Sequence, residues 1–256
     1  MSTFVQTSFK NMNLAIDIGN TRTKVAVYEN NIISDIEIFE QINFRKKIQN
    51  LISNCIQKPN IILTSVKNFN QEDEKWLTEN SNLTIINSKT PLPFINKYGT
   101  PETLGIDRRV LATGATLKFP KQNRLIIDAG TCITYDFVNA TDEYLGGAIS
   151  PGINLKYKSL NDYTDKLPLL SLNENHPIIG NSTNDSIHSG VINATLFEID
   201  GFINSYINDF QNLTIILTGG DAEFLAKRLK NTIFANPNFL LESLIMLYQY
   251  KIDHDK

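Results

Sequence analysis

The sequence has little cysteine and no long apolar run. Its two cysteines, Cys55 and Cys132, lack the spacing of a metal site or a redox pair, which favours a reducing compartment. No stretch approaches the roughly 20 apolar residues of a membrane-spanning helix. Residues 1–12 are polar and lack the apolar centre of a signal peptide, so we interpret them as an N-terminal extension. These absences predict a cytoplasmic protein with no membrane partner.

An excess of positive charge is also missing. The chain has 24 Lys and Arg residues against 27 Asp and Glu residues, a net charge of -3 and a pI near 5.7. Proteins that bind nucleic acids usually carry a concentrated basic surface, so this composition disfavours a nucleic acid as partner. Histidine is scarce as well, and we expect surface or packing roles for the three that occur: His176, His188 and His254.

Two common nucleotide-binding motifs do not occur in the sequence. Neither the P-loop pattern G-x-x-x-x-G-K-[ST] nor the glycine-rich pattern G-x-G-x-x-G is present, which removes the main support for a P-loop enzyme or a protein kinase. The chain is instead an ordinary globular sequence of 256 residues, 41% of them hydrophobic and 20% charged, long enough to bury a substantial core.

Residues 14–28 contain the first distinctive pattern. An apolar segment leads into Asp17-Ile18-Gly19, polar residues follow, and a second apolar segment begins at Val25, which predicts a strand, a tight turn and a strand. Gly19 would let the backbone approach a ligand closely, so neighbouring N–H groups and hydroxyls could surround phosphate oxygens. Asp17 would then offer an oxygen ligand to a divalent cation. The same pattern also fits an ordinary hairpin whose loop faces solvent.

The pattern recurs in the second half of the chain. Residues 124–136 again form an apolar segment that ends in D-x-G, followed by Thr131 and a second predicted strand. In each half a third strand follows, and then helices and strands alternate. We therefore predict a duplicated α/β fold, with one lobe at 13–121, a second at 122–256 and a cleft between them. Within it we expect a proline-rich loop at 90–101 and helices at 103–118 and 183–208.

A third pattern lies where the helix at 103–118 begins. Gly105 precedes Asp107 and Arg108, which fall in the first turn of this helix. The positive end of the helix dipole would keep Asp107 ionised and able to accept a proton. Arg108 offers a planar fork suited to a carboxylate. Alternatively, Asp107 is an ordinary acidic residue at a helix start, and Thr183, in a later G-x-S-T segment, is a helix cap.

Taken together, these segments resemble the type III pantothenate kinases of the actin, Hsp70 and sugar-kinase superfamily. The matching motifs extend from about Leu14 to Gly220 in the family's order. They are D-I-G-N-T-R-T-K, K-Y-x-x-P-x-x-L-G-x-D-R, D-A-G-T-x-x-T-x-D, G-G-x-I-x-P-G, L-P and G-x-S-T, followed by Thr218-Gly219-Gly220. The resemblance implies an actin-like (ribonuclease H-like) fold in each lobe.

The resemblance also implies how ATP and its cations are bound. Thr131 would contact the nucleotide phosphates, Asp17 would lie near Mg²⁺, directly or through water, and Asp128 would hold a monovalent cation, K⁺ or NH₄⁺. The ATP phosphate loop would consist of Asp17, Ile18, Gly19, Asn20, Thr21, Arg22, Thr23 and Lys24.

Pantothenate is the acceptor that the resemblance implies. Asp107 would be the base facing the primary hydroxyl that receives the phosphoryl group, in the first step of coenzyme A biosynthesis. The family works as a homodimer, so we expect one here. The residues implied to line the pantothenate site are Tyr98, Gly105, Ile106, Asp107, Arg108 and Thr183.

Two other functions are compatible with such a fold. The protein could be a non-catalytic relative that acts as an accessory factor. Such a protein would have no chemical reason to keep together the set Asp17, Asp107, Arg108 and Asp128. It could also be a kinase or phosphatase of the same superfamily that acts on a sugar or on polyphosphate. The segment from Lys97 to Arg108 argues against that, because it supplies a specific pocket and not a generic phosphate loop.

Overall fold

The structure is a computed structural model that describes residues 12–254 except 54, 68 and 176. His176 and all of the predicted N-terminal extension except Met12 therefore lie outside the described residues. Met12 is buried against the core of the first sheet and is packed as part of that sheet's unit. In the described part of the chain, the helices are too short or too polar to cross a membrane.

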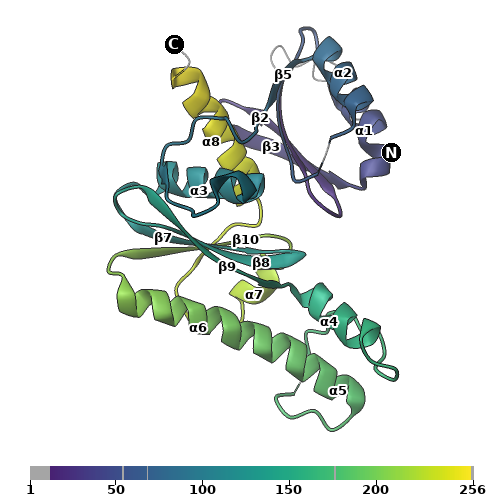
Figure 1. Cartoon of the computed structure of the whole chain (residues 1–256). Helices are drawn as coiled ribbons and strands as arrows, with labels where there is room; N and C mark the ends of the chain where they lie inside the picture. Colours follow the sequence, from purple (N-terminus) through teal and green to yellow (C-terminus); the bar gives the residue numbers. More distant parts are fainter. Residues whose placement is uncertain (1–11, 54, 68, 176, 255–256) are drawn as a thin grey trace. The chain divides into compact units, whose positions relative to one another are not determined.

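The chain forms two compact units (Figure 1). The first comprises Met1–Pro93, Thr100–Gly114 and Leu240–Lys256, and the second comprises Phe94–Gly99 and Ala115–Phe239. The C-terminal residues Leu240–Lys256 therefore belong to the first unit. The expected lobes at 13–121 and 122–256 would place them in the second. Helix α3 (Ile106–Lys118) passes from one unit to the other.

The first unit is built on a sheet with the strand order β3-β2-β1-β4-β5. Strand β1 pairs antiparallel with β2, which pairs antiparallel with β3, whereas β4 lies parallel to β1 and β5 parallel to β4. Leu14, Ile16 and Ile18 of β1 face a core that Phe44 and Leu77 of two helices complete. The elements are β1 (Asn13–Ile18), β2 (Thr23–Glu29), β3 (Ile32–Phe39), a 3₁₀ turn (Gln41–Asn43), α1 (Phe44–Ile52), β4 (Asn60–Ser65), α2 (Gln71–Asn80) and β5 (Asn82–Ile85).

The remaining elements of the first unit lie around the start of α3. A 3₁₀ turn (Pro101–Thr103) precedes α3, which begins at Ile106 and not at residue 103 as expected. Helix α8 (Phe239–His254) packs closely on α3, because a Cβ on Gly114 would overlap the side chain of Ser243.

The second unit is built on a sheet with the strand order β11-β10-β7-β8-β9-β6. Figure 1 shows α6 lying along one face of this sheet, where the apolar core of the unit is found. The strands are β6 (Ile95–Asn96), β7 (Asn123–Ala129), β8 (Cys132–Val138), β9 (Glu143–Pro151), β10 (Leu213–Thr218) and β11 (Phe234–Ala235). The helices are α4 (Ile153–Asp162), α5 (Thr183–His188), a π-helical turn (Ser189–Asn193), α6 (Ala194–Asp209) and α7 (Ala222–Ala226).

The structure corrects one sequence-based expectation for the second unit and refines another. The proline-rich loop expected at 90–101 contains the short strand β6, which pairs with β9. The helix expected at 183–208 is confirmed, since residues 183–209 are helical throughout, and it contains a π-helical turn at Ser189–Asn193. His188 lies just before this turn, is buried and bonds the hydroxyl of Tyr157 through Nδ1 (2.8 Å), which confirms a packing role.

The two units repeat one arrangement of strands, as the duplicated hairpin predicts. In the first unit β1 has the antiparallel hairpin partner β2 on one side and the parallel strand β4 on the other. In the second unit β7 has β8 and β10 in the same two positions. Each D-x-G sequence therefore lies at the end of a strand between one antiparallel and one parallel neighbour.

Candidate functional site

The turn after β1 is held by backbone hydrogen bonds. The N–H of Gly19 donates to the carbonyl of Arg22 (3.1 Å), which closes the turn, and the N–H of Val66 donates to the carbonyl of Ile18 (3.1 Å). Asp17 is half-buried and lies opposite Lys24 on β2. The exposed residues at the tip, Asn20, Thr21 and Arg22, leave the turn open to a ligand.

The side chains of Ile18 and Thr23 are fully buried and lie opposite one another on β1 and β2. Ile18 belongs to the core that α1 and α2 cover. Any contribution of Ile18 to a phosphate loop must therefore come from its backbone groups.

Lys67 is a neighbour of this turn that we did not predict from the sequence. Its Nζ donates a hydrogen bond to the carbonyl of Asn20, and the rest of the side chain is exposed. Lys67 follows β4, which runs parallel to β1, so the end of β4 arrives at the same edge of the sheet as the turn. The sequence signal was a basic residue just after a buried strand, which is too common to be informative by itself.

The second turn, after β7, is enclosed by two other segments. Gly130 donates to the carbonyl of Cys132 (2.9 Å), and Gly152 donates to the carbonyl of Thr131 (3.0 Å). The N–H of Asp221 donates to the carbonyl of Ala129 (3.0 Å). Thr131 is exposed at the tip of this turn, where a ligand can reach it.

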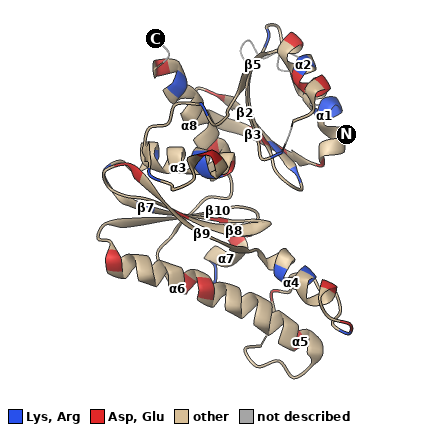
Figure 2. Cartoon of the chain, in the orientation of Figure 1, with Lys and Arg blue, Asp and Glu red and all other residues tan. Residues whose placement is uncertain are grey.

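A network of polar groups fixes the segment that carries Gly152. Glu198 of α6 accepts hydrogen bonds from Tyr135 (2.7 Å), from Ser150 and from Lys156 of α4 (2.8 Å). Figure 2 shows basic residues on α4 and acidic residues along α6, and this ion pair joins the two helices. Burial by itself would raise the pKa of Glu198, but its three hydrogen-bond donors outweigh that effect and lower the pKa. Glu198 therefore stays ionised and holds β9 and α4 beside the turn.

Asp128 lies at the carboxyl end of β7, between two threonines. Thr218 of β10 and Thr134 of β8 are its register partners on either side. The hydroxyl of Thr134 donates to Asp136 (3.1 Å), which also accepts a hydrogen bond from Tyr144. Asp136 is fully buried, so this group of side chains forms a fixed polar row on the face of the sheet opposite the apolar core.

Asp107 is held by the first turn of α3. Its Oδ1 accepts a hydrogen bond from the backbone N–H of Arg108 (2.8 Å), and its side chain is half-buried. A Cβ on residue 105 would lie 2.5 Å from Asp107 Oδ1, so glycine is needed there for the carboxylate to occupy this position. The backbone and Gly105 together fix the direction of the carboxylate.

The adjacent arginines have different surroundings. Arg109 is buried and donates to the carbonyls of Ser88 (3.1 Å), Pro101 and Leu104 (3.4 Å). It therefore ties the segment before α3 to that helix, a role that we did not predict from the sequence. Arg108 is also buried, directly after Asp107.

Tyr98 and Thr183 belong to the second unit. The ring of Tyr98 is half-exposed and packs edge-on against Tyr144, with 6.0 Å between ring centroids. Gly146 leaves room for this ring, since a Cβ there would lie 3.1 Å from it. Thr183 is the exposed first residue of α5, and Ser182, not Thr183, caps the helix by accepting from the N–H of Asp185 (3.1 Å). The alternative role of Thr183 as a helix cap is therefore wrong.

The predicted residues are thus distributed over both units. The first unit contains Asp17 to Lys24, Gly105, Ile106, Asp107 and Arg108. The second unit contains Tyr98, Asp128, Thr131 and Thr183. Among the described residues, no three His, Cys, Asp or Glu side chains gather as metal ligands. A cation at Asp17 or Asp128 would therefore need oxygen ligands other than clustered carboxylates.

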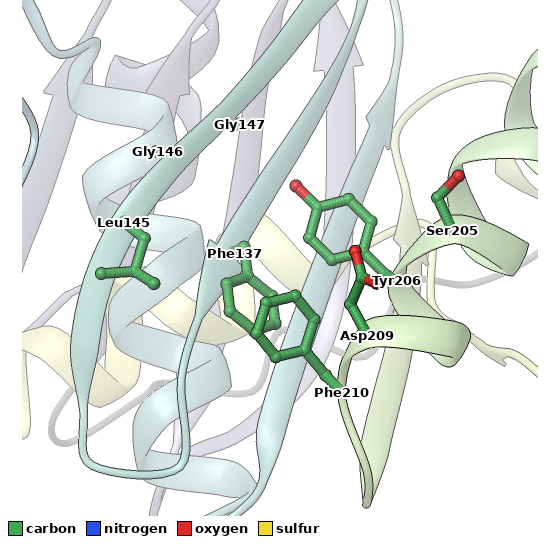
Figure 3. Close-up of a pocket in the computed structure, with 8 residues that line it drawn as sticks. All are labelled: Phe137, Leu145, Gly146, Gly147, Ser205, Tyr206, Asp209 and Phe210. Atoms are coloured by element: carbon green, nitrogen blue, oxygen red, sulfur yellow. The ribbon is translucent and has the colours of Figure 1, made fainter.

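A pocket of about 290 Å³ lies on the α6 side of the second sheet (Figure 3). Its lining consists of Phe137, Leu145, Gly146, Gly147, Ser205, Tyr206, Asp209 and Phe210. Figure 3 shows the rings of Phe137 and Phe210 together, and their centroids are 4.3 Å apart. The lining includes none of the predicted site residues, so this pocket is separate from the polar row around Asp128.

Comparisons with known proteins identify similar chains. A family model described as type III pantothenate kinase matches residues 13–205. A type III pantothenate kinase from Flavobacterium johnsoniae is 54% identical over 95% of this chain and 100% of its own length, and one from Flavobacterium psychrophilum is 52% identical over 94% and 100%.

The fold is shared with more distant structures. The activator of 2-hydroxyisocaproyl-CoA dehydratase from Clostridium difficile, solved with bound ADPNP, has a TM-score of 0.52 at 13% identity, covering 94% of each chain. Such structural neighbours confirm the predicted actin-like α/β fold.

Proposed function

Because the chain belongs to the family of type III pantothenate kinases, we propose that it transfers a phosphoryl group from ATP to the primary hydroxyl of pantothenate, with Asp107 as the base. The product is 4'-phosphopantothenate, the first intermediate on the route to coenzyme A. The observation that carries the assignment of the base is the position of Asp107, whose carboxylate is fixed by Arg108 N–H and by the absence of a side chain at Gly105. The homodimer and the cytoplasmic location are further parts of this proposal.

Asp107 acts mainly by orienting the acceptor. Phosphoryl transfer passes through a loose transition state, so the hydroxyl loses its proton late and needs alignment more than a strong base. The carboxylate of Asp107 lies in the first turn of α3 and can accept a hydrogen bond from that hydroxyl. Arg108 is placed beside it and offers a positive charge to the carboxylate of pantothenate.

The two turns bind the phosphates of ATP. Backbone N–H groups and hydroxyls around Gly19 and Thr131 are suited to phosphate oxygens, as in other anion-binding turns. Lys67 adds a positive charge beside the first turn, where it donates to the carbonyl of Asn20. Tyr98 and Thr183 supply half-exposed and exposed polar groups for pantothenate.

The residues present also fit the two cations that we expect. Asp17 would hold Mg²⁺ on the nucleotide and Asp128 a monovalent cation, K⁺ or NH₄⁺, since both carboxylates lie at strand ends beside a phosphate-binding turn. Each also has a buried threonine hydroxyl on the neighbouring parallel strand. Bound cations would neutralise charge on the phosphates during transfer. The protein supplies oxygen ligands and fixes their positions.

The decisive test is ADP formation from ATP with the purified full chain, with and without pantothenate, in K⁺ and in K⁺-free buffer. We expect ADP formation that depends on pantothenate, and a product one phosphoryl group heavier than pantothenate by mass spectrometry. Folded protein that gives no pantothenate-dependent turnover in either buffer would favour the accessory-factor function. Turnover with a sugar or polyphosphate as acceptor instead would identify another kinase of the superfamily.

Replacing Asp128 with alanine is expected to weaken the response to K⁺. The K⁺ concentration for half-maximal activity should rise at least about tenfold, because loss of a ligand weakens a cation site by this order or more. Titration of turnover with KCl at constant ionic strength measures it. Asp165→Ala, which removes an exposed carboxylate from the same unit, is the control and should leave the titration unchanged. An unaltered K⁺ response in Asp128→Ala would show that the cation binds elsewhere.

A further inference from the structure

Thr218 has a buried hydroxyl that lacks a partner. The residue is 1% exposed, and its Oγ1 makes no hydrogen bond to any residue that the structure describes. A buried hydroxyl without a partner costs about 1–3 kcal/mol, so native proteins rarely keep one without a ligand, an ion or a water molecule beside it. Among the described residues, the hydroxyls of Thr23, Thr64 and Thr113 are also buried without a partner, so it is the position of Thr218 opposite Asp128 that points to a bound species.

The hydroxyl lies next to Asp128. Strands β10 and β7 are parallel with Thr218 opposite Asp128, and register partners project to the same face of a sheet. Leu217, which precedes Thr218 on β10, belongs to the apolar core on the other face of the sheet. Because neighbouring residues of a strand point to opposite faces, Thr218 points away from that core. A Cβ on Gly219 would lie 2.5 Å from Asp128 Oδ1, so the carboxylate extends towards the end of β10.

The first unit repeats this arrangement. Thr64 of β4 lies opposite Asp17 of the parallel strand β1, is fully buried, and its Oγ1 also lacks a partner among the described residues. Two unrelated packing defects are a poor explanation for the same pair of residues at the same place in both units. The pairs Asp17–Thr64 and Asp128–Thr218 instead indicate a shared role beside the two phosphate-binding turns.

We propose that the hydroxyl oxygen of Thr218 is a ligand of the monovalent cation that Asp128 holds, which rests on the cation site of the proposed function. The carboxylate of Asp128 and the hydroxyl of Thr218 both offer oxygen atoms, the ligands that hard cations prefer. A hydroxyl oxygen has lone pairs that can bind a cation even while its O–H group donates a hydrogen bond elsewhere. Thr134 lies on the other side of Asp128, on β8. Its hydroxyl already has a partner, because it donates a hydrogen bond to Asp136.

Thr218→Val is the main test, with Thr218→Ser as the conservative variant and Thr113→Val, which removes another buried, unpartnered hydroxyl, as the matched control. The measurement is the thermal shift of the full chain on titration with KCl, at ionic strength held constant with tetramethylammonium chloride, in the presence of Mg²⁺ and a non-hydrolysable ATP analogue. In the wild type and in Thr218→Ser we expect K⁺ to raise the Tm. In Thr218→Val the half-maximal K⁺ concentration should rise at least about tenfold. Thr113→Val should keep the wild-type K⁺ titration, because Thr113 lies within α3 and belongs to none of the proposed binding sites.

Valine has nearly the same shape as threonine, and an unpartnered hydroxyl contributes nothing to stability. Without K⁺, the Tm of Thr218→Val should therefore equal or exceed that of the wild type. Should Thr218→Val fail to fold, the hydroxyl has a structural partner and the proposal is wrong. The proposal would also be overturned by a wild-type K⁺ titration in Thr218→Val, by an equal loss in Thr113→Val, or by a wild-type protein whose Tm does not change with K⁺. Because the readout is Tm, these results are independent of pantothenate-dependent turnover, on which the proposed function is judged.

Discussion

Replacing Asp107 with asparagine is expected to lower kcat for pantothenate phosphorylation by about 100- to 10,000-fold, the usual contribution of a positioned acid–base group. Asparagine has nearly the same shape and can still accept the hydrogen bond from the N–H of Arg108. It cannot accept the proton of the acceptor hydroxyl, however, and it presents an NH₂ group on one side. The loss should therefore fall on kcat, with little change in the affinity for the nucleotide.

Three measurements separate this effect from a structural one. We expect the Tm of Asp107→Asn to fall only slightly, because an acidic residue in the first turn of a helix contributes about 0.3–1 kcal/mol. Binding of an ATP analogue should be close to that of the wild type. Asp73→Asn is the matched control, since Asp73 is an acidic residue in the first turn of α2, and its kcat should not change. A kcat of Asp107→Asn within threefold of the wild type, on the order of 0.6 kcal/mol, would mean that another group accepts the proton.

Gly219→Ala is expected to reduce the free energy of unfolding by about 2–4 kcal/mol, through backbone strain and overlap with neighbouring atoms. Gly219 has a φ of +97°, in the region that L-residues rarely adopt. A Cβ there would also overlap the carbonyl of Ala129 and lie 2.5 Å from Asp128 Oδ1. If Gly219→Ala folds, it should bind K⁺ more weakly than the wild type, because its Asp128 carboxylate must move.

The neighbouring glycine supplies the control. A Cβ on Gly220 would meet no atom within 4 Å, and its backbone is not in the left-handed region, so Gly220→Ala should change stability by no more than about 0.5 kcal/mol. Urea unfolding of both variants, followed by circular dichroism, compares them directly. Equal stabilities of Gly219→Ala and Gly220→Ala would show that the end of β10 is not packed against Asp128 as the structure has it.

Much of the fold was accessible from the sequence because its signals are local. An apolar strand, a D-x-G turn and a second strand are encoded by residues that follow one another, and both hairpins were found where they were predicted. The start of α3 was misplaced by three residues, since the segment from Pro101 forms a separate 3₁₀ turn. Strand β6 was missed, because two residues between prolines carry no periodic pattern and pair only through their position beside β9.

By itself, the sequence determined the family, the duplicated hairpin and the residues expected to bind ATP, pantothenate and cations, since each of these depends on short motifs. Only the tertiary structure decided which distant residues adjoin those motifs: Thr64 beside Asp17, Thr218 beside Asp128, Lys67 beside the first turn and Arg109 around the segment before α3. The physical reason is that parallel strands far apart in the chain are aligned by the packing of their apolar faces. That alignment leaves no pattern at either residue, yet it places a threonine hydroxyl next to each carboxylate.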